Sequence, residues 1–192
     1  YPFYEVASSE HRQFFTHLMI LANGIAPTVL ALWIVPGLWT FRALRKSEKR
    51  ALWSALFMSF VLFIYGGVLG ALIHGQNVVI PAHYHGSIVG ITLAFMGVAY
   101  VLLPKLGYRD VSGWRLAYWQ PIVYGIGQIM HISGLAYSGG YGVLRKTPGE
   151  ISNISLSVKA ALGFMGLGGV IAIIGGLMFV VVLARAMWGK HG

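Results

Sequence analysis

The 192 residues are 57% hydrophobic and only 10% charged, with a mean hydropathy of +0.71. Soluble globular domains carry about 25% charged residues, so this composition excludes an ordinary water-soluble domain. The chain holds no cysteine. That excludes disulfides and thiolate metal sites, and it leaves His, Met and oxygen groups as possible metal ligands.

Five apolar segments, separated by charged or Gly/Pro-rich breaks, each approach or exceed the roughly 20 residues that a bilayer-crossing helix needs. We predict helices at 13–42, 51–74, 79–104, 115–138 and 156–186, in a single membrane domain that covers residues 1–192. The last segment is rich in glycine, and small residues allow helices to pack closely in lipid. The predicted fold class is therefore an all-α membrane protein with five transmembrane helices.

The formal net charge of +9 does not indicate nucleic-acid binding, because the basic residues lie in short loops between apolar segments. Alternate loops face opposite sides of the membrane, and the more basic side is cytoplasmic. One side has ten basic residues: Arg42, Arg45, Lys46, Lys49, Arg50, Lys105, Arg109, Arg115, Arg185 and Lys190. The other has four: Arg12, Arg145, Lys146 and Lys159. We therefore predict an external N-terminus and a cytoplasmic C-terminus.

Histidine is the main ionisable residue near or within the predicted helices, and His17, His74, His83, His85 and His131 all lie toward the outer ends. His83 and His85 begin the third helix. At about 100° per residue, their side chains point about 200° apart, so they cannot chelate one ion together. They could instead serve two cofactors, since neutral imidazole is an axial ligand of heme iron. The alternative is one hydrogen-bonded core histidine and one interfacial histidine; His17 and His74 could also be interfacial.

The third helix resembles the tenth helix of subunit I of the heme–copper oxidases. The resemblance rests on Val-Ile-Pro-Ala-His-Tyr-His at 79–85 and on Leu-Leu-Pro-Lys-Leu-Gly at 102–107. Four flanking segments are similar to neighbouring helices of that family: 66–70 to the ninth, 12–16 and 26–28 to the eighth, and 134–146 to the end of the eleventh and its loop. The five segments then correspond to helices eight to twelve of a twelve-helix bundle.

The resemblance implies a role for four residues. His83 is expected to be the catalytic-site residue, as axial ligand of the high-spin heme, and His85 is expected to be one of two ligands of the low-spin heme. Arg145 and Lys146 are expected to pair with heme propionates through charge-assisted hydrogen bonds. The alternative for these two basic residues is an ordinary solvated loop.

The resemblance also implies partners. In the family the copper ligands lie on the sixth and seventh helices and the other low-spin heme ligand lies on the second. None of these helices is present, so we expect a membrane chain that carries the first seven helices, as a split subunit or as the rest of a longer polypeptide. We also expect two hemes, copper in the completed binuclear centre, other oxidase subunits, and cytochrome c, a cupredoxin or quinol as electron donor. The expected location is a prokaryotic cytoplasmic membrane or an equivalent energy-transducing membrane.

The function implied is that of the C-terminal part of a heme–copper terminal oxidase that reduces O2 to water. Two alternatives stay open. The first is a nitric oxide reductase of the same superfamily, with non-heme iron in place of copper; the lack of a carboxylate or lysine proton relay in the apolar interiors of the predicted helices favours it. The second is a non-catalytic membrane subunit, such as a transporter bundle or a cytochrome b-type anchor in which His17 or His131 pairs with His83.

Overall fold

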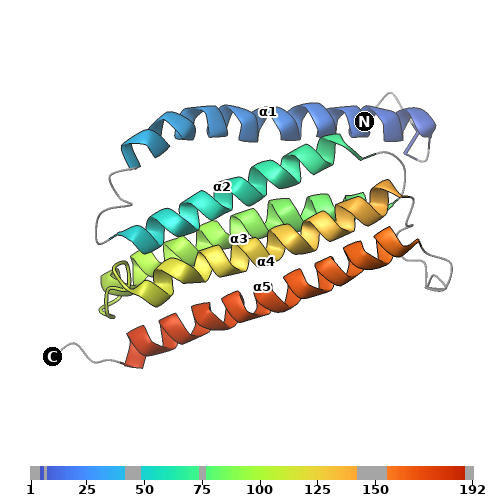
Figure 1. Cartoon of the computed structure of the whole chain (residues 1–192). Coiled ribbons are helices and arrows are strands. Elements are labelled where there is room, and N and C mark those ends of the chain that lie inside the picture. The colour runs from blue at the N-terminus through green and yellow to red at the C-terminus, as the bar shows by residue number, and fades with distance from the viewer. Residues whose placement is uncertain (1–4, 7, 42–48, 74–76, 142–154, 189–192) are drawn as a thin grey trace. The chain divides into compact units, whose positions relative to one another are not determined.

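The computed structural model describes residues 5–6, 8–41, 49–73, 77–141 and 155–188. These residues form five long α-helices (Figure 1): α1 (Ser9–Phe41), α2 (Arg50–Ala71), α3 (Val79–Lys105), α4 (Arg115–Gly140) and α5 (Leu156–Trp188). Each helix lies within a few residues of the range predicted from the apolar pattern. The protein is an all-α membrane protein, as the sequence predicts.

Three of the described helices, α2, α3 and α5, are long and apolar enough to cross a membrane. α4 is long enough as well, but it carries several polar side chains, including Gln120, Gln128 and His131. That α1 and α4 also cross the membrane stays a prediction.

The chain divides into two compact units, Tyr1–Ala43 and Leu44–Gly192. The first unit contains α1, whose N-terminal turn is capped by Ser8: the His11 backbone N–H donates to Ser8 Oγ at 3.1 Å, as expected for a serine N-cap. Many large apolar side chains of α1 are exposed, and Trp33 is 84% exposed. The prediction of one membrane domain over residues 1–192 stays a prediction.

In the second unit, α2 packs along α3 and α4 packs along α5, while α4 also contacts α2 and α3 (Figure 1). The α2–α3 contact is close because glycines face each other. A Cβ on Gly66 would collide with the backbone of Gly86 and Ser87, and a Cβ on Gly86 would collide with Gly66. The helix backbones thus approach closely where no side chains intervene, as small residues permit in membrane helices.

The prediction that the glycine-rich last helix packs closely against its neighbours is confirmed most clearly at Gly168 and Gly175. A Cβ on Gly168 would meet the backbone of His131, and a Cβ on Gly175 would meet the backbone of Tyr124, so both contact α4. By contrast, a Cβ on Gly163, Gly166 or Gly176 would have no neighbour within 4 Å. The glycine-rich sequence therefore has one face in contact with α4 and another that is open.

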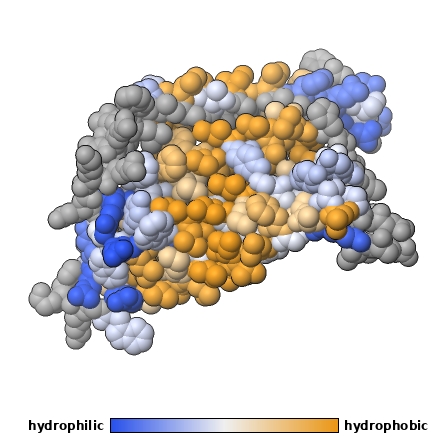
Figure 2. All heavy atoms as spheres, viewed as in Figure 1, coloured by the Kyte–Doolittle hydropathy of each residue, from blue (hydrophilic) through white to orange (hydrophobic). Residues whose placement is uncertain are grey.

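Two buried clusters fill the second unit, one toward each end. The first contains Tyr100, Leu103, Val111 and Val182, near the loop that joins α3 to α4. The second contains Leu62, Leu69, Ala82, Leu93 and Ile132. Over the middle of these helices the visible face is largely hydrophobic, and hydrophilic side chains gather where the α3–α4 loop lies (Figure 2). This distribution is the one that a bilayer requires.

Candidate functional site

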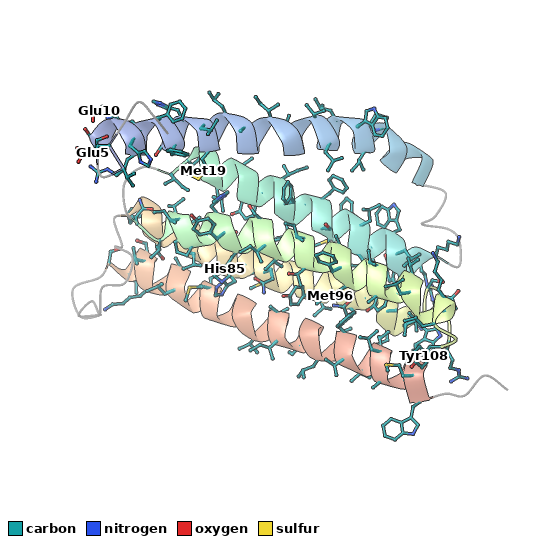
Figure 3. All side chains as sticks on the ribbon, turned by 180° about the vertical axis from the view of Figure 1, so that it is seen from behind. Glu5, Glu10, Met19, His85, Met96 and Tyr108 are labelled. Carbon is teal, nitrogen blue, oxygen red and sulfur yellow. The ribbon has the colours of Figure 1, made fainter. Side chains whose placement is uncertain are left out.

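His83 and His85 project from the first turns of α3 toward different neighbouring helices. The His83 ring is half-buried against α2, where its Nδ1 lies 2.7 Å from the carbonyl oxygen of Gly66. The His85 ring is exposed, and its centroid lies 5.3 Å from that of His131 on α4. Figure 3 shows His85 toward the N-terminal end of α3, with Met96 near the middle of the helix and Tyr108 beyond its other end. The two imidazoles therefore occupy opposite sides of one helix, as their spacing predicts.

Hydrogen bonding fixes the tautomer of both rings. The Nδ1 atom of His85 lies 2.8 Å from the carbonyl oxygen of Pro81, one turn earlier in the same helix. A carbonyl oxygen can only accept, so in both rings Nδ1 carries the hydrogen and donates it. In the neutral ring, Nε2 then keeps its lone pair. Metal-ligating histidines typically donate their other N–H to a backbone carbonyl or a carboxylate, which orients the ring and raises its basicity.

The His83 ring occupies space that exists because residue 70 is glycine. A Cβ added to Gly70 would lie 2.7 Å from His83 Nδ1 and 2.8 Å from Cε1. Carbon atoms in favourable contact are about 3.5–4.0 Å apart. Gly70 and the Gly66 carbonyl thus form a cradle on α2 that holds the ring by its Nδ1 edge. Only one face of α2 is used in this way, because a Cβ on Gly67 would meet nothing within 4 Å.

His131 lies next to His85, which the sequence analysis did not predict. Its Nδ1 lies 3.1 Å from the Met165 carbonyl oxygen on α5, so its Nε2 is likewise the nitrogen with the free lone pair. The His85 and His131 rings are tilted by 44°. Sequence reasoning considered His131 only as a partner for His83, yet the structure places it beside His85. Three imidazoles with the same tautomer thus lie in the same end of the second unit.

The antiparallel register of α3 and α4 accounts for this arrangement. A Cβ on Gly139, near the end of α4, would contact the backbone of Val79, the first residue of α3. The C-terminal end of α4 is therefore held against the N-terminal end of α3, and His131 comes to lie level with the start of that helix. If the end of α4 is paired with the start of α3, counting residues back along α4 from Gly139 brings His131 near His85. That pairing is the signal that could have linked the two histidines.

The other predicted site residues are not part of this geometry. Arg145 and Lys146 lie outside the described residues, as does His74. His17 is an exposed residue of α1 in the first unit. The roles expected for Arg145 and Lys146 at heme propionates therefore stay predictions.

The positions of His83 and His85 are compatible with axial ligation of heme. Within the described ranges, no three His, Cys, Asp or Glu side chains gather closely enough to hold a metal. A porphyrin supplies four nitrogens itself and needs only one or two axial ligands from protein. His83 and His85 each offer one Nε2 with an oriented ring, which is the protein contribution that a heme requires.

Several neutral polar side chains deeper in the second unit are hydrogen-bonded to neighbouring helices. The Tyr100 hydroxyl donates to Gln120 Oε1 at 2.8 Å, and Gln120 Nε2 lies 3.2 Å from the Gly175 carbonyl oxygen and 3.3 Å from Met96 Sδ. Nearer the histidines, the Tyr65 and Ser133 hydroxyls are 2.9 Å apart. Gln120 was not singled out from the sequence, although it is a buried amide that connects α3, α4 and α5. These contacts cross-link helices and contain no charged group.

Comparison with known proteins found sequence relatives that are longer than this chain. No protein-family model matches the sequence. An uncharacterized protein of Rickettsia prowazekii, RP382, is 35% identical over 224 aligned positions, which cover 98% of this chain and 44% of that protein. An uncharacterized protein of Aquifex aeolicus is 33% identical over 60 positions, covering 31% of this chain and 16% of that protein. The chain thus spans less than half the length of these relatives.

One solved structure is similar over nearly the whole chain. A heme-copper terminal oxidase, determined as a dimer by cryo-electron microscopy, aligns with a TM-score of 0.69 and 20% sequence identity. The match covers 93% of this chain and 36% of the oxidase chain. At this identity the likeness shows the fold alone: the fold of this chain is similar to part of that oxidase. It agrees with the resemblance carried by the histidine sequence of α3.

Proposed function

We propose that this chain is the heme-carrying, C-terminal part of the catalytic subunit of a heme–copper respiratory reductase, and that its reaction is the reduction of O2 to water. The observation that carries the proposal is the pair His83 and His85. Their Nδ1 atoms donate to separate backbone carbonyls, and their rings leave α3 toward α2 and α4 respectively. The oxidase-like fold supports it independently.

In this proposal His83 holds the high-spin heme and His85 holds the low-spin heme. When bound, heme supplies an iron that carries electrons and, at an open coordination position, reacts with a diatomic gas. The chain orients the axial ligands: the Gly66 carbonyl and the space above Gly70 fix the His83 ring, and the Pro81 carbonyl fixes the His85 ring. Because both residues lie on α3, one rigid helix sets the separation of the two sites.

The remaining ligands belong to another chain or to another part of a longer chain. The proposal needs copper ligands, a second ligand for the low-spin heme and an electron donor, for which cytochrome c, a cupredoxin or quinol is suitable. The match to this chain covers only 44% of RP382. The rest of that relative is long enough to contain further helices, and this supports the proposal. Arg145 and Lys146 are proposed to bind heme propionates.

The test is the optical spectrum of the reduced protein, purified with its native partners, before and after addition of CO. Wild type is expected to show one low-spin heme and one CO-reactive heme. His83→Ala should lose the CO-reactive signal and keep the low-spin band, whereas His85→Ala should lose the low-spin band. Tyr84→Phe, which changes the residue between them without removing an imidazole, is the matched control and should leave both signals. Loss of both signals or of neither in His83→Ala would overturn the assignment.

Nitric oxide reduction is the second candidate. Apart from residues in the terminal turns, the described parts of α2, α3, α4 and α5 carry no Asp, Glu, Lys or Arg, so no charged side chain is available there to relay protons across the bilayer. Metal analysis of the purified complex distinguishes the two: copper alongside heme iron supports O2 reduction, and iron in excess of heme with no copper supports NO reduction. A single six-coordinate heme that does not bind CO would instead indicate a cytochrome b-type anchor.

A further inference from the structure

A pocket with three arginines lies at the opposite end of the second unit from the histidines. Twenty residues of α3 separate His85 from Lys105, a helical rise of about 30 Å. The pocket has a volume of about 520 Å³ and lies among the α3–α4 loop, the start of α4 and the end of α5. Its lining residues are Arg109, Trp114, Arg115, Leu116, Arg185 and Trp188.

The loop that forms one wall of this pocket is held in place by backbone contacts. Gly107 adopts a positive φ of 83°, which a side chain would disfavour. The Ala51 N–H of α2 donates to the Ser112 carbonyl at 3.1 Å, and the Arg109 N–H lies 3.5 Å from the Ala186 carbonyl on α5. The loop is thus anchored to both α2 and α5, and Arg109 is held beside the end of α5.

Among the described residues, no carboxylate forms an ion pair with the arginines of the pocket. Asp110 is next to Arg109 in sequence, but its Oδ1 accepts from the Ser112 N–H and Oγ. Within the part of the chain that the structure describes, no ion pair joins the guanidinium groups of Arg109, Arg115 or Arg185 to an acidic residue. The positive-inside rule explains why basic residues are abundant at this end. It does not explain why three of them line one pocket.

The start of α4 adds to the positive potential. α4 begins at Arg115, its N-cap residue Trp114 makes no side-chain cap hydrogen bond, and its first turn contains no acidic residue. The N-terminal end of a helix carries a partial positive charge and unpaired N–H donors, which favour anions. An arginine at this position is electrostatically unfavourable by itself, and a bound anion would relieve the repulsion.

We propose that this pocket binds the phosphate group of an anionic phospholipid from the membrane leaflet at this end. Arginine side chains recognise phosphate oxygens through paired, charge-assisted hydrogen bonds. The indole rings of Trp114 and Trp188 suit the depth of lipid headgroups, and Trp188 is 89% exposed. Exposed apolar side chains close by, Leu106 and Met187, offer a surface for the acyl chains. A free phosphate would use the same arginines but not this apolar surface.

The test measures lipid binding to the full-length protein purified with its native partners. The delipidated protein is titrated with phosphatidylglycerol or phosphatidylcholine in detergent, and bound lipid is counted by native mass spectrometry. Wild type should bind one phosphatidylglycerol saturably and with clear preference over phosphatidylcholine. Arg109→Gln and Arg185→Gln should each weaken this binding by about tenfold or more, since a hydrogen bond to a charged group is lost. Lys105→Gln, an exposed cation outside the pocket, should change it by less than about fivefold.

The outcomes distinguish specific binding of an anionic lipid in the pocket from nonspecific attraction of anions to a basic surface. No preference for phosphatidylglycerol in wild type, or an equal loss in Lys105→Gln and the two arginine variants, would overturn the proposal. Competition by millimolar inorganic phosphate, with the same dependence on arginine, would show that a soluble anion is the ligand and would also overturn the lipid assignment. Helical circular dichroism of each variant confirms folding, and heme spectra are not needed for the result.

Discussion

Substitution of Gly70 by alanine tests the cradle that orients His83. The new Cβ would lie 2.7 Å from His83 Nδ1 and 2.8 Å from Cε1, closer by roughly 0.7–0.8 Å than the roughly 3.5 Å of normal contact. The ring must therefore move away from α2. This movement breaks its 2.7 Å hydrogen bond to the Gly66 carbonyl.

The expected cost follows from these two changes. Overpacking of a well-packed interior costs about 1–3 kcal/mol, and loss of the hydrogen bond costs about 0.5–1.5 kcal/mol. The greater helix propensity of alanine returns about 1 kcal/mol. We therefore expect a net destabilisation of roughly 1–3 kcal/mol. If heme binds on this ring, its affinity should fall by roughly 10- to 100-fold.

Gly67→Ala is the matched control, because it makes the same chemical change on the same helix where nothing lies within 4 Å of the new methyl group. Both variants are compared by thermal unfolding in detergent and by the CO difference spectrum of the reduced protein. Gly70→Ala should unfold at a lower temperature and lose CO-reactive heme, whereas Gly67→Ala should keep the wild-type spectrum and unfold at the wild-type temperature or slightly above it. Equal behaviour of the two variants would refute the argument that residue 70 must be glycine to hold the ring.

Three further changes test other parts of the structure. Gln120→Leu should destabilise the protein by about 1–3 kcal/mol in thermal unfolding, because it leaves the buried Tyr100 hydroxyl without its acceptor; unchanged stability would contradict this. Gly66→Ala should reduce folded yield in size-exclusion chromatography more than the matched alanine control does, since its Cβ collides with the backbone of α3; equal yields would count against a close helix contact. His131→Ala should shift the low-spin heme band and spare the CO-reactive one, because its ring lies beside His85 and not in the cradle; a change confined to the CO-reactive heme would reverse the assignment.

Much of the fold follows from properties that act locally along the chain. Apolar length defines the helices, and the 100° step of an α-helix places His83 and His85 on opposite sides of α3 without knowledge of any neighbour. The structure shows the two rings against α2 and α4, in agreement with that reasoning. That either ring binds heme stays a prediction.

The features that could not be predicted depend on how helices pack laterally. His131 lies beside His85 because the end of α4 is held against the start of α3, and this register is set by the close contact at Gly139. Similarly, a glutamine in an apolar segment indicates a buried hydrogen bond, but the sequence does not show that the partner of Gln120 on α4 is Tyr100 on α3. Counting basic residues gave the predicted orientation but could not show that three arginines converge on one pocket.

The most direct test of the central claim is a cryo-electron microscopy map of the protein purified from its native membrane with its partners. The proposed function predicts density for two porphyrins on opposite sides of α3, one with its iron at Nε2 of His83 and the other with its iron at Nε2 of His85. A map in which either imidazole has no iron beside it, or in which both rings face lipid, would contradict the account.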